Sequence, residues 1–250
     1  MKRNQRTELI VLQSEKNGEN HKLVSMFTEK FGLVRALAFG ASGSKSPMRA
    51  ATSPFCLSDG ELYHDPVKDL WRITHLNGKN LYDGIRGNLK KFYIVSFLAE
   101  VVLKTYGGGD ERVYQLFTKT LLLIDKAIND CDVDRLLILY LWRYLWMNGV
   151  LPDLKGCSIC GKEIFLQDPI YYKGDGLFCC GGCRSRSFLE LNHGAKEYLY
   201  NTSTMTYEEA LPVFLDAEAL SNIKKCFILI VQALVEYPLK TLESGRSFIF

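Results

Sequence analysis

The sequence has no uninterrupted apolar run long enough to cross a membrane. Its long apolar runs, such as LLILYLW and LLLI, fall far short of the roughly 18 residues that a membrane span needs. It also lacks a cationic start followed by roughly 7–15 apolar residues, the pattern of a secretory signal peptide. We therefore expect a cytoplasmic protein with reduced cysteines. Cys56, Cys131 and Cys226 are expected to be small buried apolar residues.

The motifs of hydrolytic enzymes are missing as well. The four histidines lie in separate segments, with no Gly-x-Ser-x-Gly or His-Glu-x-x-His motif near them. The stretch Gly40–Ser46, GASGSKS, follows an expected strand and contains Lys-Ser, as a phosphate-binding P-loop does. However, it has no glycine before Lys45, and Pro47 and Pro54 argue against the helix that should follow. A flexible basic loop is the better interpretation, and we expect no enzymatic activity.

The composition is that of a folded protein with an uneven distribution of charge. The chain has 250 residues, of which 47% are hydrophobic and 24% charged, and its formal net charge is only +3. Residues 1–50 hold nine Lys or Arg against four Asp or Glu, and the interval Lys30–Ser58 contains no acidic residue. Such a basic surface suits a polyanion, although a merely solubilising surface is as common.

Short runs rich in β-branched and aromatic residues dominate the first eighty residues. They are separated by turn-forming Gly, Asn, Asp and Pro, and read ELIVLQS, HKLVSMFT, LVRALAFG, PFCLSDGELY and DLWRITHL. Five strands in such a short stretch predict a small closed barrel, and the OB-fold is the commonest five-stranded barrel. We therefore predict an OB-fold domain over residues 1–80.

From Leu81 the spacing of apolar residues becomes that of amphipathic helices. The pattern predicts helices over residues 81–106, 110–128, 132–150, 186–200, 206–220 and 221–236, the first ended by Gly107–Gly109. Trp142, Tyr144 and Trp146 resemble a base-stacking platform, but aromatic residues on a mostly apolar helix are more often core, and we favour the core. The fold class is α+β, with a helical domain over residues 81–250.

Five of the eight cysteines fall within residues 157–183. The pairs Cys157-x2-Cys160 and Cys180-x2-Cys183 are separated by 19 residues, a spacing typical of a structural zinc site. Between them, PIYYKGDGLF predicts a hairpin that carries the second pair. We therefore predict a zinc-ribbon module at residues 157–183, inserted in the helical domain, in which the four cysteines hold one structural Zn²⁺ ion.

Other interpretations of the cysteines are weaker but stay open. Cys179 can replace Cys180, although Cys180 keeps the two-residue spacing in both pairs. A thioredoxin-like redox site needs one Cys-x-x-Cys beside a βαβ pattern, which two matched pairs fit poorly. Four thiolates leave no place for a catalytic water, and the His-x-Glu and Pro-Cys-x-x-Cys elements of nucleotide deaminases are absent.

The order of barrel, helices and inserted cysteine module resembles the bacterial recombination mediator family RecO. The resemblance covers essentially the whole chain. Its most specific phrase is G-x-L-P-x-L-x-x-C-x-x-C-G at Gly149–Gly161, supported by KLVSMFTEKFGLVRALAFGASGSKS from Lys22, SPFCLSDGELY from Ser53 and GDGLFCCGGC up to Cys183. In that family a glycine lies four residues before the third cysteine. Gly176 lies there relative to Cys180, which favours Cys180 again.

The resemblance implies a DNA repair protein that is not an enzyme. Proteins similar to RecO bind single- and double-stranded DNA, anneal complementary strands and work with RecR to place RecA on DNA coated by single-strand-binding protein. The implied partners are therefore DNA, RecR, single-strand-binding protein and, indirectly, RecA. The implied location is the bacterial cytoplasm, in association with the nucleoid.

The implied DNA contacts are basic residues of the barrel. We expect Arg35, Lys45 and Arg49 to contact phosphates, followed by Lys22 and Lys30. This chain departs from the family in the loop after the third strand, where positions 41 to 44 read Ala-Ser-Gly-Ser and the family usually has Arg and Lys.

Two functions of other classes stay open from the sequence. One is a zinc-ribbon adaptor that acts mainly through protein–protein contacts. The other is a thiol redox enzyme that uses Cys179 and Cys180, for which we would expect a lowered thiol pKa and full activity without metal.

Overall fold

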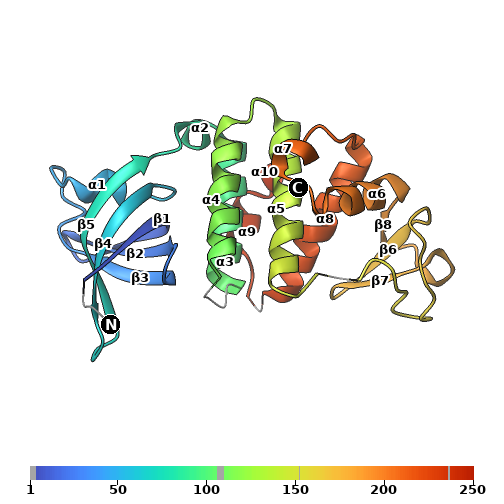
Figure 1. The fold of residues 1–250 in the computed structure, drawn as a ribbon, viewed down its shortest axis with the longest axis horizontal. Helices are drawn as coiled ribbons and strands as arrows, with labels where there is room; N and C mark the ends of the chain where they lie inside the picture. Colours follow the sequence, from blue (N-terminus) through green and yellow to red (C-terminus); the bar gives the residue numbers. More distant parts are fainter. Residues whose placement is uncertain (1–3, 106–109, 152, 236) are drawn as a thin grey trace. The chain divides into compact units, whose positions relative to one another are not determined.

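The computed structural model describes residues 4–105, 110–151, 153–235 and 237–250. The chain forms two compact units, Met1–Asp125 and Lys126–Phe250 (Figure 1). The first unit therefore includes helices that follow the barrel. The domain limits expected from the sequence stay a prediction.

The first unit begins with five strands that close into a barrel. These strands are β1 (Asn4–Asn17), β2 (His21–Thr28), β3 (Gly32–Ala38), β4 (Leu57–Asp65) and β5 (Leu70–Asn80). Their order around the barrel is β1-β2-β3-β5-β4, and β1 pairs with β4 to complete it. All neighbouring pairs are antiparallel except β3 and β5, which run parallel. The predicted five-stranded OB-type barrel is confirmed.

The two-residue periodicity of the strands decides which side chains fill the barrel. In β3, Val34, Ala36 and Ala38 are buried, whereas Arg35 between them is exposed. Inward side chains of the other strands, together with Cys56 just before β4, complete a core of small and medium apolar residues; those on the strands are Leu9, Val11, Val24, Met26, Leu62, Ile73 and Leu76. The alternate residues of each strand form the outer surface.

A single helical turn, α1 (Met48–Ala51), lies between β3 and β4. Ala51 is buried in the barrel core and Met48 packs against it, so the turn covers part of the barrel interior. The sequence argued against a helix after the loop at Gly40–Ser46, and this was wrong for one turn. Pro47 occupies the N-cap position, where its missing N–H costs nothing. The turn is too short to form a P-loop helix.

Three helices complete the first unit: α2 (Asp83–Arg86), α3 (Leu89–Thr105) and α4 (Glu111–Lys126). Phe27 on β2 packs edge-on against Tyr114 and Phe117 of α4, with ring centroids 5.3 and 5.9 Å apart. The predicted helix start at Leu81 was wrong. The long helix starts at Leu89, where the side chain of Asn88 accepts a hydrogen bond from the Lys91 amide at 3.0 Å. The predicted end at Gly107–Gly109 lies outside the described residues.

The second unit has two long helices in contact, α5 (Asp130–Met147) and α8 (Ala217–Leu234). Trp142 stacks on Phe227 with ring centroids 5.8 Å apart, and Lys224 forms a buried ion pair with Asp134 at 3.2 Å. Shorter helices complete the unit, namely α6 (His193–Thr202), α7 (Tyr207–Ala210), α9 (Lys240–Ser244) and α10 (Arg246–Ile249). The predicted continuous helix over 206–220 was wrong, because Asp216 caps a new helix through the amide of Ala219 at 2.8 Å.

A three-stranded sheet packs against α8 in this unit. Its strands are β6 (Ile170–Gly174), β7 (Leu177–Cys179) and β8 (Leu189–Leu191), in the order β7-β6-β8. The predicted hairpin between the cysteine pairs is confirmed. The predicted helix over 186–200 was wrong in its first part, because β8 pairs with β6 and Asn192 caps a helix that begins only at His193.

Most expected core residues are buried, with two exceptions. Trp142 and Tyr144 lie in the core, as do Cys56 and Cys226, but Trp146 is 62% exposed and Cys131 is also exposed. Among the helices of the described ranges, none has the length and apolarity needed to cross a membrane.

We predict that Gly84→Ala destabilises the first unit. An added Cβ would collide with the backbone carbonyl of Asp125. The carboxylate of Asp125 accepts a hydrogen bond from the Ile85 amide at 3.0 Å, and its carbonyl accepts one from Lys91 Nζ at 2.9 Å. Overpacking at this junction should lower the free energy of unfolding in urea by about 1–3 kcal/mol. Gly43→Ala is the control, since its Cβ would make only ordinary contact; equal stability of both variants would contradict the prediction.

Candidate metal centre and nucleic-acid interface

Four cysteines of the second unit converge on one point. The Sγ atoms of Cys157, Cys160, Cys180 and Cys183 all lie within 4.8 Å of one another. Each pair is brought together by a tight turn, in which the Gly161 amide donates to the Cys157 carbonyl at 2.9 Å and the Cys183 amide to the Cys180 carbonyl at 3.0 Å. Gly161 has φ of +69°, a value that favours glycine.

The spacing of this cluster fits one tetrahedral ion. Four thiolates bound at about 2.3 Å from a tetrahedral ion lie about 3.8 Å apart. The Sγ atoms of Cys160 and Cys180 are 3.8 Å apart. Cys179, the alternative ligand in the sequence, is fully buried on β7 and lies outside this group. The four cysteines can therefore hold a metal ion in a closed coordination sphere.

Backbone N–H groups near Cys157 favour its thiolate form, which is the form that binds a cation. Burial tends to raise the pKa of the Cys157 thiol, but backbone N–H groups at Cys160, Cys180 and Ile159 oppose this and lower its pKa to about 6. The amide of Cys180 lies 3.4 Å from the Cys157 sulfur. The pKa of Cys183 is raised to about 12, first by its hydrogen bond with Cys160 and then by burial. Binding of a cation therefore displaces a proton at Cys183.

Lys45 and Arg49 have side chains available to a ligand. Both are exposed, and neither has an ion-pair partner within the described part of the chain. Lys45 lies in the loop between β3 and α1, which is tied to the β1–β2 turn because the Ser42 amide donates to the Asn20 carbonyl at 3.1 Å. The backbone of the loop that carries the positive charge of Lys45 is therefore held by a hydrogen bond.

The other three expected DNA contacts have partners within the first unit. Lys22 Nζ donates to the Arg49 carbonyl at 3.3 Å and to Thr52 Oγ1 at 3.0 Å, at the C-terminal end of α1. Burial and the nearby Arg49 lower the pKa of Lys22. Lys30 Nζ donates to the Arg6 carbonyl at 3.0 Å. Arg35 pairs with Glu15 at 3.2 Å, and this exposed ion pair is weak enough to be exchanged for a phosphate.

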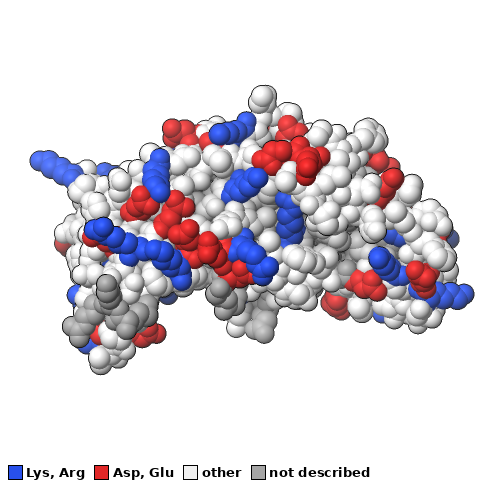
Figure 2. Space-filling model, viewed as in Figure 1, with Lys and Arg blue, Asp and Glu red and all other residues white. Residues whose placement is uncertain are grey.

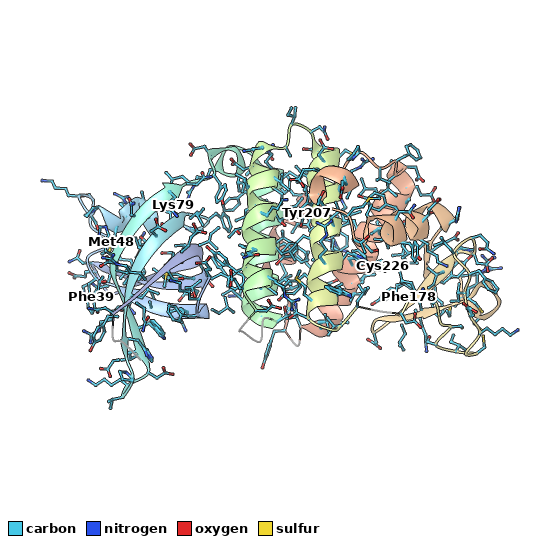
Figure 3. The ribbon with its side chains drawn as sticks, in the orientation of Figure 1. Phe39, Met48, Lys79, Phe178, Tyr207 and Cys226 are labelled. Carbon is cyan, nitrogen blue, oxygen red and sulfur yellow. The ribbon has the colours of Figure 1, made fainter. Side chains whose placement is uncertain are left out.

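Basic and acidic side chains lie close together on the barrel surface. A basic side chain that already pairs with a carboxylate is less available to bind a phosphate. Figure 2 shows Lys and Arg beside Asp and Glu on this face. Lys79, labelled in Figure 3, is held by Glu8 at 2.9 Å and Asp59 at 2.8 Å. These carboxylates raise the pKa of Lys79, and they occupy it. On the side of the barrel formed by β1, β4 and β5, the positive charge of Lys79 is therefore already balanced by carboxylates of the same unit.

The sequence reasoning missed Phe39 and Arg72. Phe39, 45% exposed, follows β3, and the guanidinium carbon of Arg72 lies over its ring, 5.7 Å from the ring centroid. The alternation in LVRALAF could have indicated an apolar outer face on β3. The position of Arg72 could not have been found in this way, because it depends on the parallel pairing of β3 with β5, which sets Leu37 opposite Arg72.

Comparison with known families agrees with this architecture. The family model described as Recombination protein O N terminal matches residues 1–82, and the model described as Recombination protein O C terminal matches residues 86–243. The chain belongs to the RecO family. The resemblance inferred from the sequence is confirmed.

Curated relatives of this RecO-family chain carry the name DNA repair protein RecO. The protein of Thermoanaerobacter sp. (strain X514) is 31% identical over 193 residues, which cover 73% of this chain and 72% of that relative. The protein of Clostridium kluyveri is 23% identical over 247 residues, which cover 98% and 94% of the two chains. The similarity therefore extends over both compact units.

We predict that Lys22→Met destabilises the barrel. Its ammonium group donates to the Arg49 carbonyl and the Thr52 hydroxyl at the end of α1, so its loss should lower the free energy of unfolding in urea by about 1 kcal/mol. Lys45→Met removes the same charge from an exposed loop position and should change stability by less than about 0.5 kcal/mol. If both variants unfold at the same urea concentration as the unmodified chain, Lys22 does not stabilise α1.

Proposed function

We propose that this chain is a DNA-binding recombination mediator. It binds single- and double-stranded DNA, anneals complementary strands and, with RecR, helps load RecA onto DNA coated by single-strand-binding protein. The proposal implies a cytoplasmic, nucleoid-associated protein of bacteria with no catalytic step of its own. The observation that carries the proposal is the acid-free interval Lys30–Ser58, where Lys45 and Arg49 are exposed on a barrel of the OB type.

Annealing requires a protein to hold two polyanions close together without reading their sequence. Basic side chains replace the counterions of the phosphates and lower the repulsion between strands. Arg35, Lys45 and Arg49 supply this charge in our proposal. Lys22 and Lys30 contribute to the same positive potential, while their ammonium groups bond carbonyls of the barrel.

We also propose that the cysteine cluster holds one structural Zn²⁺ ion. Thiolates favour soft and borderline cations such as Zn²⁺ over hard ones, and four of them leave no open position for a substrate or water. Cys157 and Cys160 come from one turn, and Cys180 and Cys183 from the turn after β7. When bound, the ion would join these two turns, which already contact each other through the hydrogen bond from the Ser158 amide to the Phe178 carbonyl at 2.9 Å.

The DNA proposal is tested by strand annealing as a function of salt. Three phosphate contacts predict about a twentyfold loss of single-strand affinity between 50 and 200 mM salt. The variant Arg35→Glu, Lys45→Glu, Arg49→Glu should bind more weakly, show a shallower salt slope and fail to anneal complementary oligonucleotides. The control Lys162→Glu, Lys173→Glu, Lys225→Glu makes the same charge change at exposed positions of the second unit. Affinity that does not respond to salt, or equal loss in both variants, would count against the barrel site.

The zinc proposal is tested by metal content and thermal unfolding. The unmodified chain should carry one zinc ion, and Cys160→Ser should lose it. Its unfolding midpoint should fall by at least about 5 °C because folding of the ribbon is coupled to the metal. Cys131→Ser, an exposed cysteine outside the cluster, is the control and should keep the ion. If Cys160→Ser keeps its stability but loses DNA or partner binding, the ribbon is a contact surface and the adaptor function is favoured.

A further inference from the structure

Leucine side chains lie on the outer phase of β2 and β3, on either side of the polar pair Ser25 and Arg35. Leu23 on β2 pairs with Leu37 on β3, and both side chains are on the outer phase of their strands, half-buried. Leu33 lies on the same phase of β3, and Leu70, at the start of β5, is 51% exposed. We call this set, together with Phe39, the outer apolar strip.

Phe39 ends the strip and is held in place by its neighbours. The His21 ring meets it edge-on with centroids 5.0 Å apart, and the Gly40 amide donates to His21 Nδ1 at 3.1 Å. Gly40 has φ of +67°, so the turn after Phe39 relies on a glycine. Phe39, labelled in Figure 3, is therefore held in position by its neighbours although the residue is 45% exposed.

Cations border the outer apolar strip. Arg72 lies over the Phe39 ring and has no acidic partner within the described part of the chain. Arg35 lies on the same outer phase of β3 as Leu33 and Leu37, and Glu15, with which it forms an ion pair, is exposed. The strip therefore combines apolar surface with guanidinium groups that attract phosphate.

An unpaired nucleic-acid strand matches this combination best. Its bases expose flat apolar faces that stack on aromatic side chains, while its phosphates meet the arginines. A duplex hides its base faces and offers only phosphates and groove edges. The face of the second and third strands is also the surface that OB-folds use for oligonucleotides.

We infer that Phe39, with Arg72 over its ring, is a stacking platform for unpaired bases on the outer apolar strip. This inference rests on the proposed DNA-binding function and specifies which form of DNA the strip selects. Arg35, Lys45 and Arg49 supply affinity for any polyanion. Phe39 supplies preference for a strand with free base faces.

The test compares three probes of equal length by fluorescence anisotropy: oligothymidine, the same backbone without bases, and a duplex. Phe39→Ala should weaken oligothymidine binding by at least about fivefold and leave the salt slope unchanged, because no phosphate contact is removed. Its affinity for the abasic strand and the duplex should not change. Phe39→Trp should restore oligothymidine binding. Phe165→Ala removes a similarly exposed ring (55%) from the second unit and should bind all probes normally.

The outcomes separate this inference from the proposed function. If the unmodified chain binds none of the probes, the DNA-binding function itself fails. If it binds them and Phe39→Ala, with an unchanged unfolding midpoint, weakens all three equally or none, only the stacking platform is overturned. If Phe39→Ala keeps every DNA affinity but loses binding to RecR, the strip is a protein-docking surface and the inference is also overturned.

Discussion

The parallel pairing of β3 with β5 is the constraint on which the first unit depends. It joins a strand that ends at Ala38 to one that begins at Leu70, and it completes a barrel whose other pairs are antiparallel. Closure removes free strand edges and forces each strand to put alternate residues inside. The segment between β3 and β4 must then fold against the barrel end, where Ala51 and Met48 join the core.

The same closure sorts the basic residues into two groups. Lys22 lies on the inward phase of β2, and its ammonium group donates to the Arg49 carbonyl and the Thr52 hydroxyl at the end of α1. Arg35 lies on the outward phase of β3, and Lys45 and Arg49 lie beyond the core in the loop and on α1. Charge alone does not distinguish these residues. Their hydrogen-bond partners distinguish them, because a basic side chain that already bonds backbone oxygens gains less free energy from a phosphate than one without such bonds.

In the second unit, the comparable constraint is the cluster of four cysteine side chains. A three-stranded sheet with strands as short as three residues buries too little surface to fold alone, and it is supported by α8 on one side and by the cysteine cluster at its turns. The buried ion pair of Lys224 with Asp134 joins α8 to α5. The four clustered cysteines lie at the turns beside this sheet, whereas the named contacts between α5 and α8 involve none of them.

The sequence by itself determined the elements whose cause is local. Alternating apolar residues predicted all five barrel strands, matched Cys-x2-Cys pairs predicted the four-cysteine cluster, and turn residues predicted the β6–β7 hairpin. It failed where tertiary contacts overrule local pattern: Leu189–Leu191 is a strand because β6 offers it a partner, and Trp146 is exposed because α5 buries a different face. Only the tertiary structure decided that Lys22 donates hydrogen bonds at the end of α1 and that the Arg72 guanidinium lies over the Phe39 ring. Both facts depend on strand register between distant segments, which no local spacing encodes.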